Sequence, residues 1–320
     1  MDITTTFGGF YKIMLKFQDA IKKFYHRCIA MNVSYRTVET YRYIFKGFNA
    51  FLATRNIDCI ESITSDDIRA YLGLLRTKGY APDTIKDRYV GIAALFNFLC
   101  ADGLIVGNPV KAVKKPKVPK IKARTFTASE LQRILGYYKT ETFAGLRNKT
   151  ILYLLYGTGI RKSELLGLTV FSLHLDMNCM TVIGKGEKER EVPLSPVLVK
   201  LLRIYLGRRE EILINHSVET SILIITKYGR PLTDSGLREV FRELKDKAGI
   251  VGPRVSPHTM RHSFAKNFLL NGADLFSLQA VLGHESVSTT RIYVDYNKLE
   301  LGQQMKNFCP LDNSKWSYLG

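Results

Sequence analysis

The stretch VKAVKKPKVPKIKAR at residues 110–124 divides this chain of 320 residues into two unequal parts. It holds seven basic residues, two prolines and no acidic residue. Such a composition disfavours a packed element and is typical of an extended linker. The sequence therefore predicts two folded domains joined by a basic connector. The connector is either a plain solvated tether or, as we prefer in so basic a chain, a segment that also lies along phosphate groups.

The whole chain shares this basic character, with a net charge of +18 and a pI near 9.6. A polyanionic partner, most commonly nucleic acid, is the expected consequence, although a merely soluble basic surface would carry the same charge. The five cysteines stand apart without a CxxC pair, which argues against a disulfide framework or a zinc site and fits a reducing cytoplasm. We expect neither a secretory signal nor a membrane span, because no apolar run is long enough.

Residues 12–106 are predicted to fold as several amphipathic helices. Residues 34–52 carry apolar side chains near helical spacing, and Thr64 with Asp67 has the pattern of a capping box at the start of another helix. Four helices of this kind make a small bundle.

The part after the connector is predicted to be mostly helical with one small antiparallel sheet. Thr127 and Glu130 form a second capping-box pattern. Residues 179–194, CMTVIGKGEKEREVPL, combine a β-branched strand, a glycine-rich charged turn and a second short strand, which predicts a β-hairpin. The expected fold class is therefore mainly α, of the α+β kind, with an N-terminal four-helix bundle and a mostly helical second domain.

The segment GTGIRKSELLGL, residues 157–168, ends one helix at its glycines and starts another. We expect Thr158 to cap the second helix, which puts Arg161 in its first turn. The N–H groups and the dipole at such a helix end favour anions, and a guanidinium there can grip a phosphate in bidentate fashion. A surface arginine paired with Glu164 explains the segment equally well.

The segment SPHTMRHSFAKNFLLNG, residues 256–272, has the pattern of a complete helix, with serine as N-cap, proline at the first position and glycine at the end. His258 and Arg261 are three residues apart, so they share a face near the helix N-terminus. An imidazole beside a guanidinium suits an anionic site that transfers protons. His262 lies partly on that face, and we expect it to pack or to support the other groups.

Two further candidates, Tyr293 and Lys185, gain meaning only from their surroundings. Tyr293 follows His284 by nine residues, and a phenol becomes a useful nucleophile only when cations or a base act on it. Any one of the 17 tyrosines is by itself more readily a core or interface aromatic. Lys185 lies between two glycines in the predicted turn, where it could protonate a departing oxygen, although a solvated turn lysine is the commoner case.

Together these pieces resemble the tyrosine recombinase (phage integrase) family. The family pattern is an arginine, a lysine on a β-hairpin, a His-x-x-Arg pair, a histidine or tryptophan, and a tyrosine. The matching blocks are GTGIRKSELLGL, VIGKGEKEREVPL, HTMRHSFA and LGHESVSTTRIY. The likeness is close over residues 127–296, whereas residues 12–106 resemble the family's core-binding domain in size and helix pattern only. The layout is similar to that of Xer-type recombinases and compact mobile-element integrases.

The resemblance implies a catalytic set made of Arg161, Lys185, His258, Arg261, His284 and Tyr293. In this set the arginines clamp the scissile phosphate, Tyr293 attacks the phosphorus, and Lys185 protonates the leaving 5′ oxygen. His258 accepts or positions the tyrosine proton, and His284 donates a hydrogen bond to the phosphate. Glu164 and His262 are expected to support these groups. Neither a metal ion nor a cofactor is implied.

The resemblance further implies an enzyme that cleaves and rejoins double-stranded DNA at paired sites. The route is a 3′-phosphotyrosyl intermediate and a Holliday junction, used for integration, excision or resolution by a homotetramer, with the need for accessory proteins left open. The expected bounds are 1–109 for a core-type DNA-binding domain, 110–126 for the linker, 127–296 for the catalytic domain and 297–320 for a tail that packs on a neighbouring protomer. The linker residues expected on DNA are Lys111, Lys114, Lys115, Lys117, Lys120, Lys122 and Arg124.

Three other interpretations share part of this pattern. A type IB topoisomerase-like enzyme would use the same chemistry without joining two sites. A DNA-binding regulator on a decayed recombinase scaffold is disfavoured by the complete six-residue set. A basic RNA-binding protein is disfavoured because the chain lacks an aromatic RNP stretch.

Overall fold

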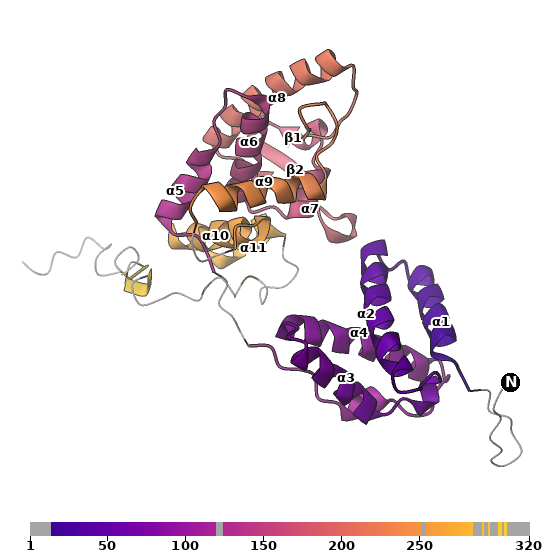
Figure 1. Ribbon diagram of the computed structural model, residues 1–320. Coiled ribbons are helices and arrows are strands. Elements are labelled where there is room, and N and C mark those ends of the chain that lie inside the picture. The colour runs from indigo at the N-terminus through magenta and orange to yellow at the C-terminus, as the bar shows by residue number, and fades with distance from the viewer. Residues whose placement is uncertain are drawn as a thin grey trace, which may run out of the picture. The chain divides into compact units, whose positions relative to one another are not determined.

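The computed structural model describes residues 14–119, 124–250 and 254–283, together with residues 290, 294, 300–302, 304 and 305; of Lys185 it describes the backbone only. The chain divides into two compact units, Met1–Ile121 and Lys122–Gly320 (Figure 1). Each unit has its own hydrophobic core. The predicted fold class, mostly helical with one small antiparallel sheet, is confirmed.

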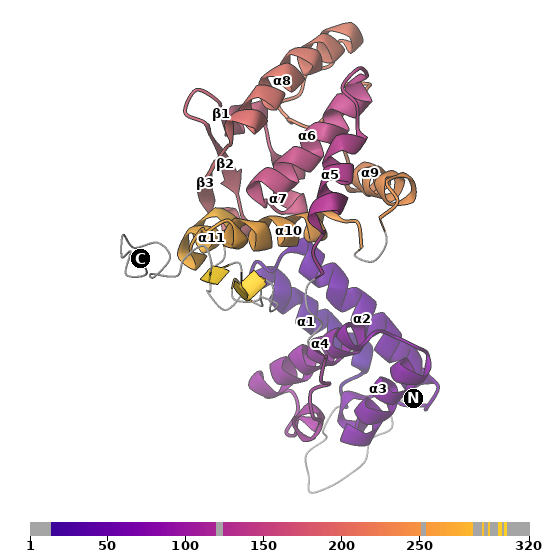
Figure 2. The same cartoon turned by 90° about the vertical axis from the view of Figure 1, so that its left-hand side faces the viewer.

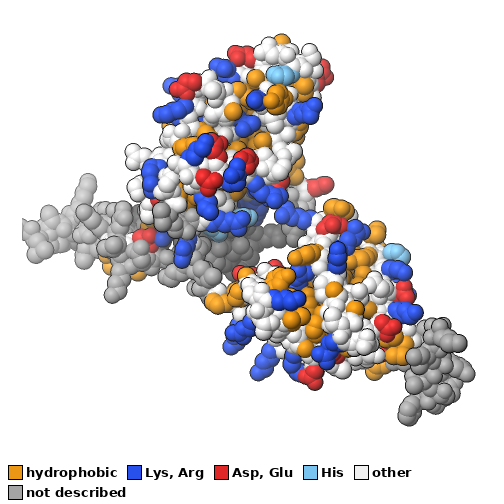
Figure 3. All heavy atoms as spheres, viewed as in Figure 1, with side chains coloured by type: hydrophobic (Ala, Val, Ile, Leu, Met, Phe, Trp, Pro, Cys, Tyr) orange, Lys and Arg blue, Asp and Glu red, His pale blue; other side chains and the backbone are white. Residues whose placement is uncertain are grey.

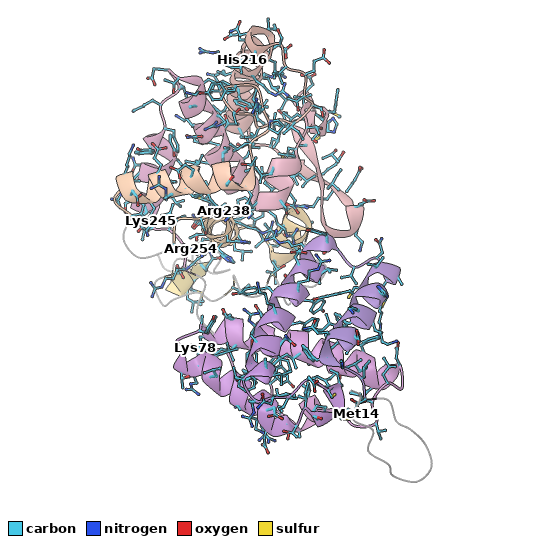
Figure 4. The ribbon with its side chains drawn as sticks, turned by 45° about the vertical axis from the view of Figure 1, so that its right-hand side comes forward. Met14, Lys78, His216, Arg238, Lys245 and Arg254 are labelled. Carbon is cyan, nitrogen blue, oxygen red and sulfur yellow. The ribbon has the colours of Figure 1, made fainter. Side chains whose placement is uncertain are left out.

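Unit 1 is a bundle of four helices around an aromatic core. Edge-to-face contacts join Phe24 to Phe45 and Phe17 to Phe48, with ring centroids 5.5 and 5.7 Å apart. The capping box predicted at Thr64 is present at the start of the third helix, which ends at its C-cap Lys78 (Figure 4). The helices are α1 (Phe17–Ala30), α2 (Tyr35–Ala53), α3 (Ser65–Thr77) and α4 (Pro82–Ala101), with short 3-10 turns at Ile60–Ser62 and Pro109–Ala112.

The first residues of the basic connector belong to unit 1. Val110 and Val113 are buried in its core. Arg69 donates to the Ala112 carbonyl at 2.9 Å, and the Tyr89 hydroxyl donates to the Val113 carbonyl at 3.0 Å. The extended part therefore begins after Val113 and not at residue 110, because two apolar side chains in the basic run have a core to enter. The predicted domain bounds as a set stay a prediction.

Unit 2 surrounds a three-stranded antiparallel sheet with helices. The predicted hairpin is present, with Thr181 opposite Glu191, and its outer neighbour is a strand of two residues that was not expected because so short a segment has no periodicity. The elements are α5 (Ala128–Tyr137), α6 (Phe143–Thr158), α7 (Lys162–Gly167), β1 (Leu173–His174), β2 (Cys179–Ile183), β3 (Glu189–Pro193), α8 (Pro196–His216), α9 (Asp234–Lys247), α10 (Pro257–Leu270) and α11 (Leu275–Leu282), with 3-10 turns at Val170–Ser172 and Lys185–Glu187.

The last two helices bring distant parts of unit 2 together. Helix α10 packs against α6 and α11, and α11 packs against β3. Figures 1 and 2 both show α10 and α11 side by side, next to α7. The end of α6, the start of α7, the β2–β3 hairpin and the end of α11 therefore meet within one unit.

Candidate active site

Gly159 ends α6 and determines where Arg161 lies. Its φ is 65°, and a Cβ at this position would lie 2.4 Å from the Phe264 ring, so only glycine fits. Thr158 stays inside α6 because the left-handed residue comes after it, and the expectation that it caps the next helix was wrong. Arg161 itself is the N-cap of α7, and its backbone N–H donates to the Glu164 carboxylate at 2.7 Å.

Glu164 is a buried carboxylate shared by two arginines, and its side chain is only 2% exposed. Arg161 Nη1 donates to Oε1 at 2.7 Å, while Arg190 makes a bidentate pair at 3.0 and 2.9 Å. Burial by itself raises the pKa of Glu164, but the hydrogen bonds from Arg190 and Arg161 outweigh it and lower the pKa to about 2. The alternative from the sequence, a surface Arg161 paired with Glu164, is therefore correct about the pair. The Glu164 carboxylate is buried, however, and it also binds a second arginine.

Replacing Glu164 with glutamine is expected to destabilise the protein by about 3 kcal/mol at neutral pH. A folded-state pKa of about 2, against the ordinary 4.5, gives a contribution that is complete above pH 4.5 and is lost as the pH falls toward 2. Urea unfolding of both proteins at about pH 7 and about pH 3 should show the difference shrinking by roughly half. Glu239→Gln, which removes an exposed partner of Arg242, is the matched control and should shift the midpoint little. If the difference in unfolding free energy between the two proteins stayed constant with pH, Glu164 would not be ionised in the folded protein.

Arg190 on β3 is a site residue that the sequence analysis missed. Besides the pair with Glu164, its Nε donates to the Val281 carbonyl at 3.0 Å, and its side chain is 14% exposed. In the sequence it is one of six charged residues in the predicted hairpin. The signal that could have found it is alternation, because Arg190 precedes the fully buried Val192 by two positions and so points to the same face.

Arg261 reaches inward from α10. The predicted N-terminus of this helix is confirmed, with Ser256 as N-cap and Pro257 at the first position. The Arg261 side chain is buried, and it donates through Nη1 to the Gly159 carbonyl at 2.5 Å and through Nη2 to the Leu282 carbonyl at 2.9 Å. His258 is exposed. The two residues expected side by side thus differ in depth, with the guanidinium inside the unit and the imidazole at its surface.

Three arginines therefore bind the C-terminal end of α11. The bonds are Arg190 to Val281, Arg261 to Leu282 and, at 3.3 Å from Nη2, Arg161 to Gly283. The last carbonyls of a helix lack partners within the helix and carry partial negative charge, so cations stabilise them. With Glu164 included, the cluster has three positive charges and one negative charge, a net +2. The next residue of the chain is His284.

His262 lies next to this cluster in the sequence and is half-buried. Burial, and then the charges of His258 and Arg261, lower the pKa of His262. This environment therefore favours the neutral form of the imidazole. This fits the supporting role expected for it, which stays a prediction.

Three predicted catalytic side chains, those of Lys185, His284 and Tyr293, lie outside the described residues, as do the linker residues Lys120 and Lys122. The backbone of Lys185 begins the 3-10 turn of the hairpin. That turn is closed by a hydrogen bond of 2.8 Å from the Gly184 N–H to the Lys188 carbonyl. The catalytic roles of these residues stay predictions.

Two of the described residues beyond position 293, Glu300 and Gln304, contact α10 of the same chain. Glu300 pairs with Lys266 at 2.6 Å, with side chains 18% and 21% exposed. The Gln304 amide donates to the Leu270 carbonyl at 3.0 Å. Packing of the tail on a neighbouring protomer stays a prediction, and it would have to replace these contacts.

Unit 2 exposes many basic side chains. Figure 3 shows lysine and arginine mixed with acidic side chains over α9, and basic side chains together with histidine just below it in that view. Arg238 and Lys245 belong to α9, and Arg254 precedes α10 (Figure 4).

Among the described residues, no three His, Cys, Asp or Glu side chains are grouped so that they could hold a metal ion. Within the same residues, every helix is too short or too polar to cross a membrane.

Family models match both parts of the chain. The model described as phage integrase family matches residues 124–300, and the model described as phage integrase, N-terminal SAM-like domain matches residues 21–104. Together they span both units and include every segment of the arginine cluster.

Similar proteins cover nearly the whole chain. It is 31% identical over 294 residues to tyrosine recombinase XerD of Listeria innocua, covering 91% of this chain and 99% of that protein. It is 33% identical over 272 residues to tyrosine recombinase XerC of Listeria welshimeri, covering 84% and 90%. The fold is similar to that of the XerH site-specific recombinase bound to palindromic difH substrate, with a TM-score of 0.72, 23% identity, and 87% and 81% of the two chains covered.

Proposed function

Because this chain belongs to the phage integrase family of tyrosine recombinases, and is thus an enzyme that recombines DNA by cleaving and rejoining it at specific sites, we propose that Arg161 and Arg261, two of the three arginines at the end of α11, stabilise the scissile phosphate. One observation supports this assignment most strongly. Arg161, Arg190 and Arg261, from three separate segments, donate to successive carbonyls directly before His284. The cluster carries a net +2, and a phosphodiester attacked by a phenolate becomes a pentacoordinate dianion, so the charges are complementary.

In the proposed step, the Tyr293 oxygen forms a bond to phosphorus while the bond from phosphorus to the 5′ oxygen breaks. The electron pair of the broken bond goes to the 5′ oxygen, which takes a proton from the Lys185 ammonium. The phenol proton goes to His258. The products are a 3′-phosphotyrosyl linkage and a 5′ hydroxyl. Because that linkage keeps the energy of the diester, the 5′ hydroxyl of a partner strand can reverse the step through a Holliday junction, and no cofactor is consumed.

Arg161 and Arg261 are proposed to neutralise the non-bridging oxygens in the transition state, and His284 to add a hydrogen bond. Glu164 holds Arg161 at two points, which supports a positioning role for its carboxylate. The side chain of Arg161 is 36% exposed, so it can contact a ligand directly, whereas the buried Arg261 acts through the charge of its guanidinium.

We propose double-stranded DNA with paired sites as the substrate, and a homotetramer as the active assembly. The net charge supports a DNA partner. Proteins of similar fold have been solved on DNA, as the XerH recombinase with difH and the Tn1549 transposon integrase with transposon right end DNA. We also propose that the enzyme acts in the cytoplasm, which its scattered cysteines fit.

A plasmid with two copies of a candidate site tests this function. The wild-type chain should convert it into the resolved or inverted product. Relaxation of supercoils without such a product would favour the topoisomerase-like alternative. Binding without any strand cleavage would favour the regulator.

The exposed part of the connector is proposed to lie along the DNA backbone. Its described basic side chains, Lys114, Lys115, Lys117 and Arg124, are all exposed, and Lys111 is exposed in the 3-10 turn that precedes it. Exposure without a fold of its own is what phosphate contacts require of such a segment.

Replacing Lys114, Lys115 and Lys117 together by glutamine should weaken DNA binding at moderate salt by about 10–100-fold. It should also make the dependence of the logarithm of affinity on the logarithm of salt concentration shallower by about 2–3, because each lost phosphate contact removes nearly one released counterion. Fluorescence anisotropy over a salt series measures both quantities. The pair Lys200→Gln and Lys227→Gln removes exposed charge elsewhere and serves as the control. An unchanged slope in the triple variant would mean that the connector is a plain tether.

A further inference from the structure

We infer that Arg190 is a positioning residue that holds the Lys185 hairpin in place for proton transfer to the leaving 5′ oxygen. The inference rests on the proposed function and extends it to a residue outside the predicted catalytic set. Its basis is the place of Arg190 between the hairpin, Glu164 and the end of α11.

The Arg190 guanidinium donates hydrogen bonds along two of its edges. Two of its nitrogens bind the Glu164 carboxylate at 3.0 and 2.9 Å, and Nε binds the Val281 carbonyl at 3.0 Å. These three bonds come from one rigid, planar guanidinium, so they fix its orientation as well as its position. The strand that carries Arg190 is therefore tied to α7 and to α11 at once.

The turn with Lys185 lies directly beside this tie. A Cβ placed on Gly184 would lie 3.6 Å from Arg190 Nη1 and 3.9 Å from Glu164 Oε1. The hydrogen bond from Gly184 to Lys188 closes the turn at this point. The backbone on one side of Lys185 is thus seated against the Arg190–Glu164 pair.

Removing Arg190 should disturb Lys185 more than Arg161. Arg161 keeps its own backbone and side-chain bonds to Glu164, at 2.7 Å each, and its bond to the Gly283 carbonyl. Gly184 has a different neighbour, because the side chain nearest to a Cβ placed there is that of Arg190, at 3.6 Å. Loss of the anchor therefore leaves the phosphate clamp in place and frees the hairpin.

The other side of Arg190 is closed by Gly283. This residue has a φ of 63°, and a Cβ there would lie 2.9 Å from Arg190 Cδ and Nε. The guanidinium thus packs on bare backbone one residue before His284. Arg190 has little room to adopt another rotamer while Gly283 and Glu164 stay in place.

The inference predicts a specific leaving-group effect. We compare two nicked suicide duplexes, one with the normal 5′ oxygen at the scissile position and one with a bridging 5′ sulfur. A thiolate has a conjugate acid with a pKa of about 8.5, far below that of an alkoxide, so sulfur leaves without help from a general acid. In full-length Arg190→Gln, cleavage of the oxygen substrate should slow by about 10–100-fold while cleavage of the sulfur substrate stays near the wild-type rate.

The readout is the cleavage rate of the sulfur substrate divided by that of the oxygen substrate, measured within each protein preparation. This ratio does not depend on the folded fraction of the protein. It should rise by about tenfold or more in Arg190→Gln, rise similarly in Lys185→Ala, and rise less in Arg190→Lys. Arg203→Gln, which loses an exposed pair with Asp176, is the matched control and should keep the wild-type ratio. A wild-type ratio in Arg190→Gln, at any overall rate, would overturn the inference. Failure of the wild-type chain to cleave either duplex would instead overturn the proposed function.

Discussion

Replacing Tyr293 with phenylalanine is expected to abolish covalent capture of DNA. On a nicked suicide duplex with a cognate site, the wild-type chain should form a protein–DNA adduct that survives a denaturing gel. The variant should lose the reaction by about 10⁵-fold or more, because no other group supplies the attacking oxygen. DNA affinity should stay close to that of the wild type, since phosphate contacts dominate it.

Tyr296 provides the matched control, because it is the same residue type three positions further along the chain. Tyr296→Phe should still form the adduct. An adduct that persists in Tyr293→Phe, or that is lost in Tyr296→Phe alone, would refute the nucleophile assignment. Mapping the cleaved strand would also show which end of the break the protein holds.

Replacing Arg161 with alanine should lower the single-turnover cleavage rate by about 10³-fold. The variant loses one charged donor to the transition state, and removal of a single such donor typically costs two to three powers of ten. The effect on DNA affinity should be much smaller, because charge on the phosphate builds up mainly in the transition state. Arg161→Lys should recover little activity, since an ammonium cannot bind Glu164 and a phosphate oxygen with the same planar geometry.

Lys162 is the control for this variant. It is adjacent, carries the same charge and pairs with Asp234 on α9 at 2.5 Å. Lys162→Ala should change cleavage by less than about threefold, whereas equal losses in both variants would mean that only the general charge of this segment matters.

The structural predictions that are confirmed depended on local sequence signals. The capping boxes at Thr64 and Thr127, the helix start at Ser256 and the hairpin over residues 179–194 depend on neighbours within a few residues, and all are present. The family pattern added the order of the catalytic candidates, which propensities alone could not supply.

The errors and omissions arose where distant contacts decide. Thr158 was expected to cap α7, but the left-handed Gly159 keeps it in α6, and Arg161 takes the cap position. The bond from Arg161 to the Gly283 carbonyl joins residues 122 positions apart, so no local pattern could reveal it. Arg190 was missed because an arginine on a charged strand becomes recognisable as a site residue only when Glu164 and the end of α11 are placed around it.

Gly283 illustrates a limit on how this enzyme can evolve. A side chain there meets two obstacles of separate origin, a backbone angle of 63° and the guanidinium of Arg190 at 2.9 Å. A change that opens space by shortening Arg190 leaves the backbone angle at Gly283 unfavourable for any other residue. A substitution at Gly283 therefore carries two separate costs, one in the backbone angle and one in the packing of Arg190. The position thus ties the end of α11 to the Arg190 guanidinium with little tolerance for change.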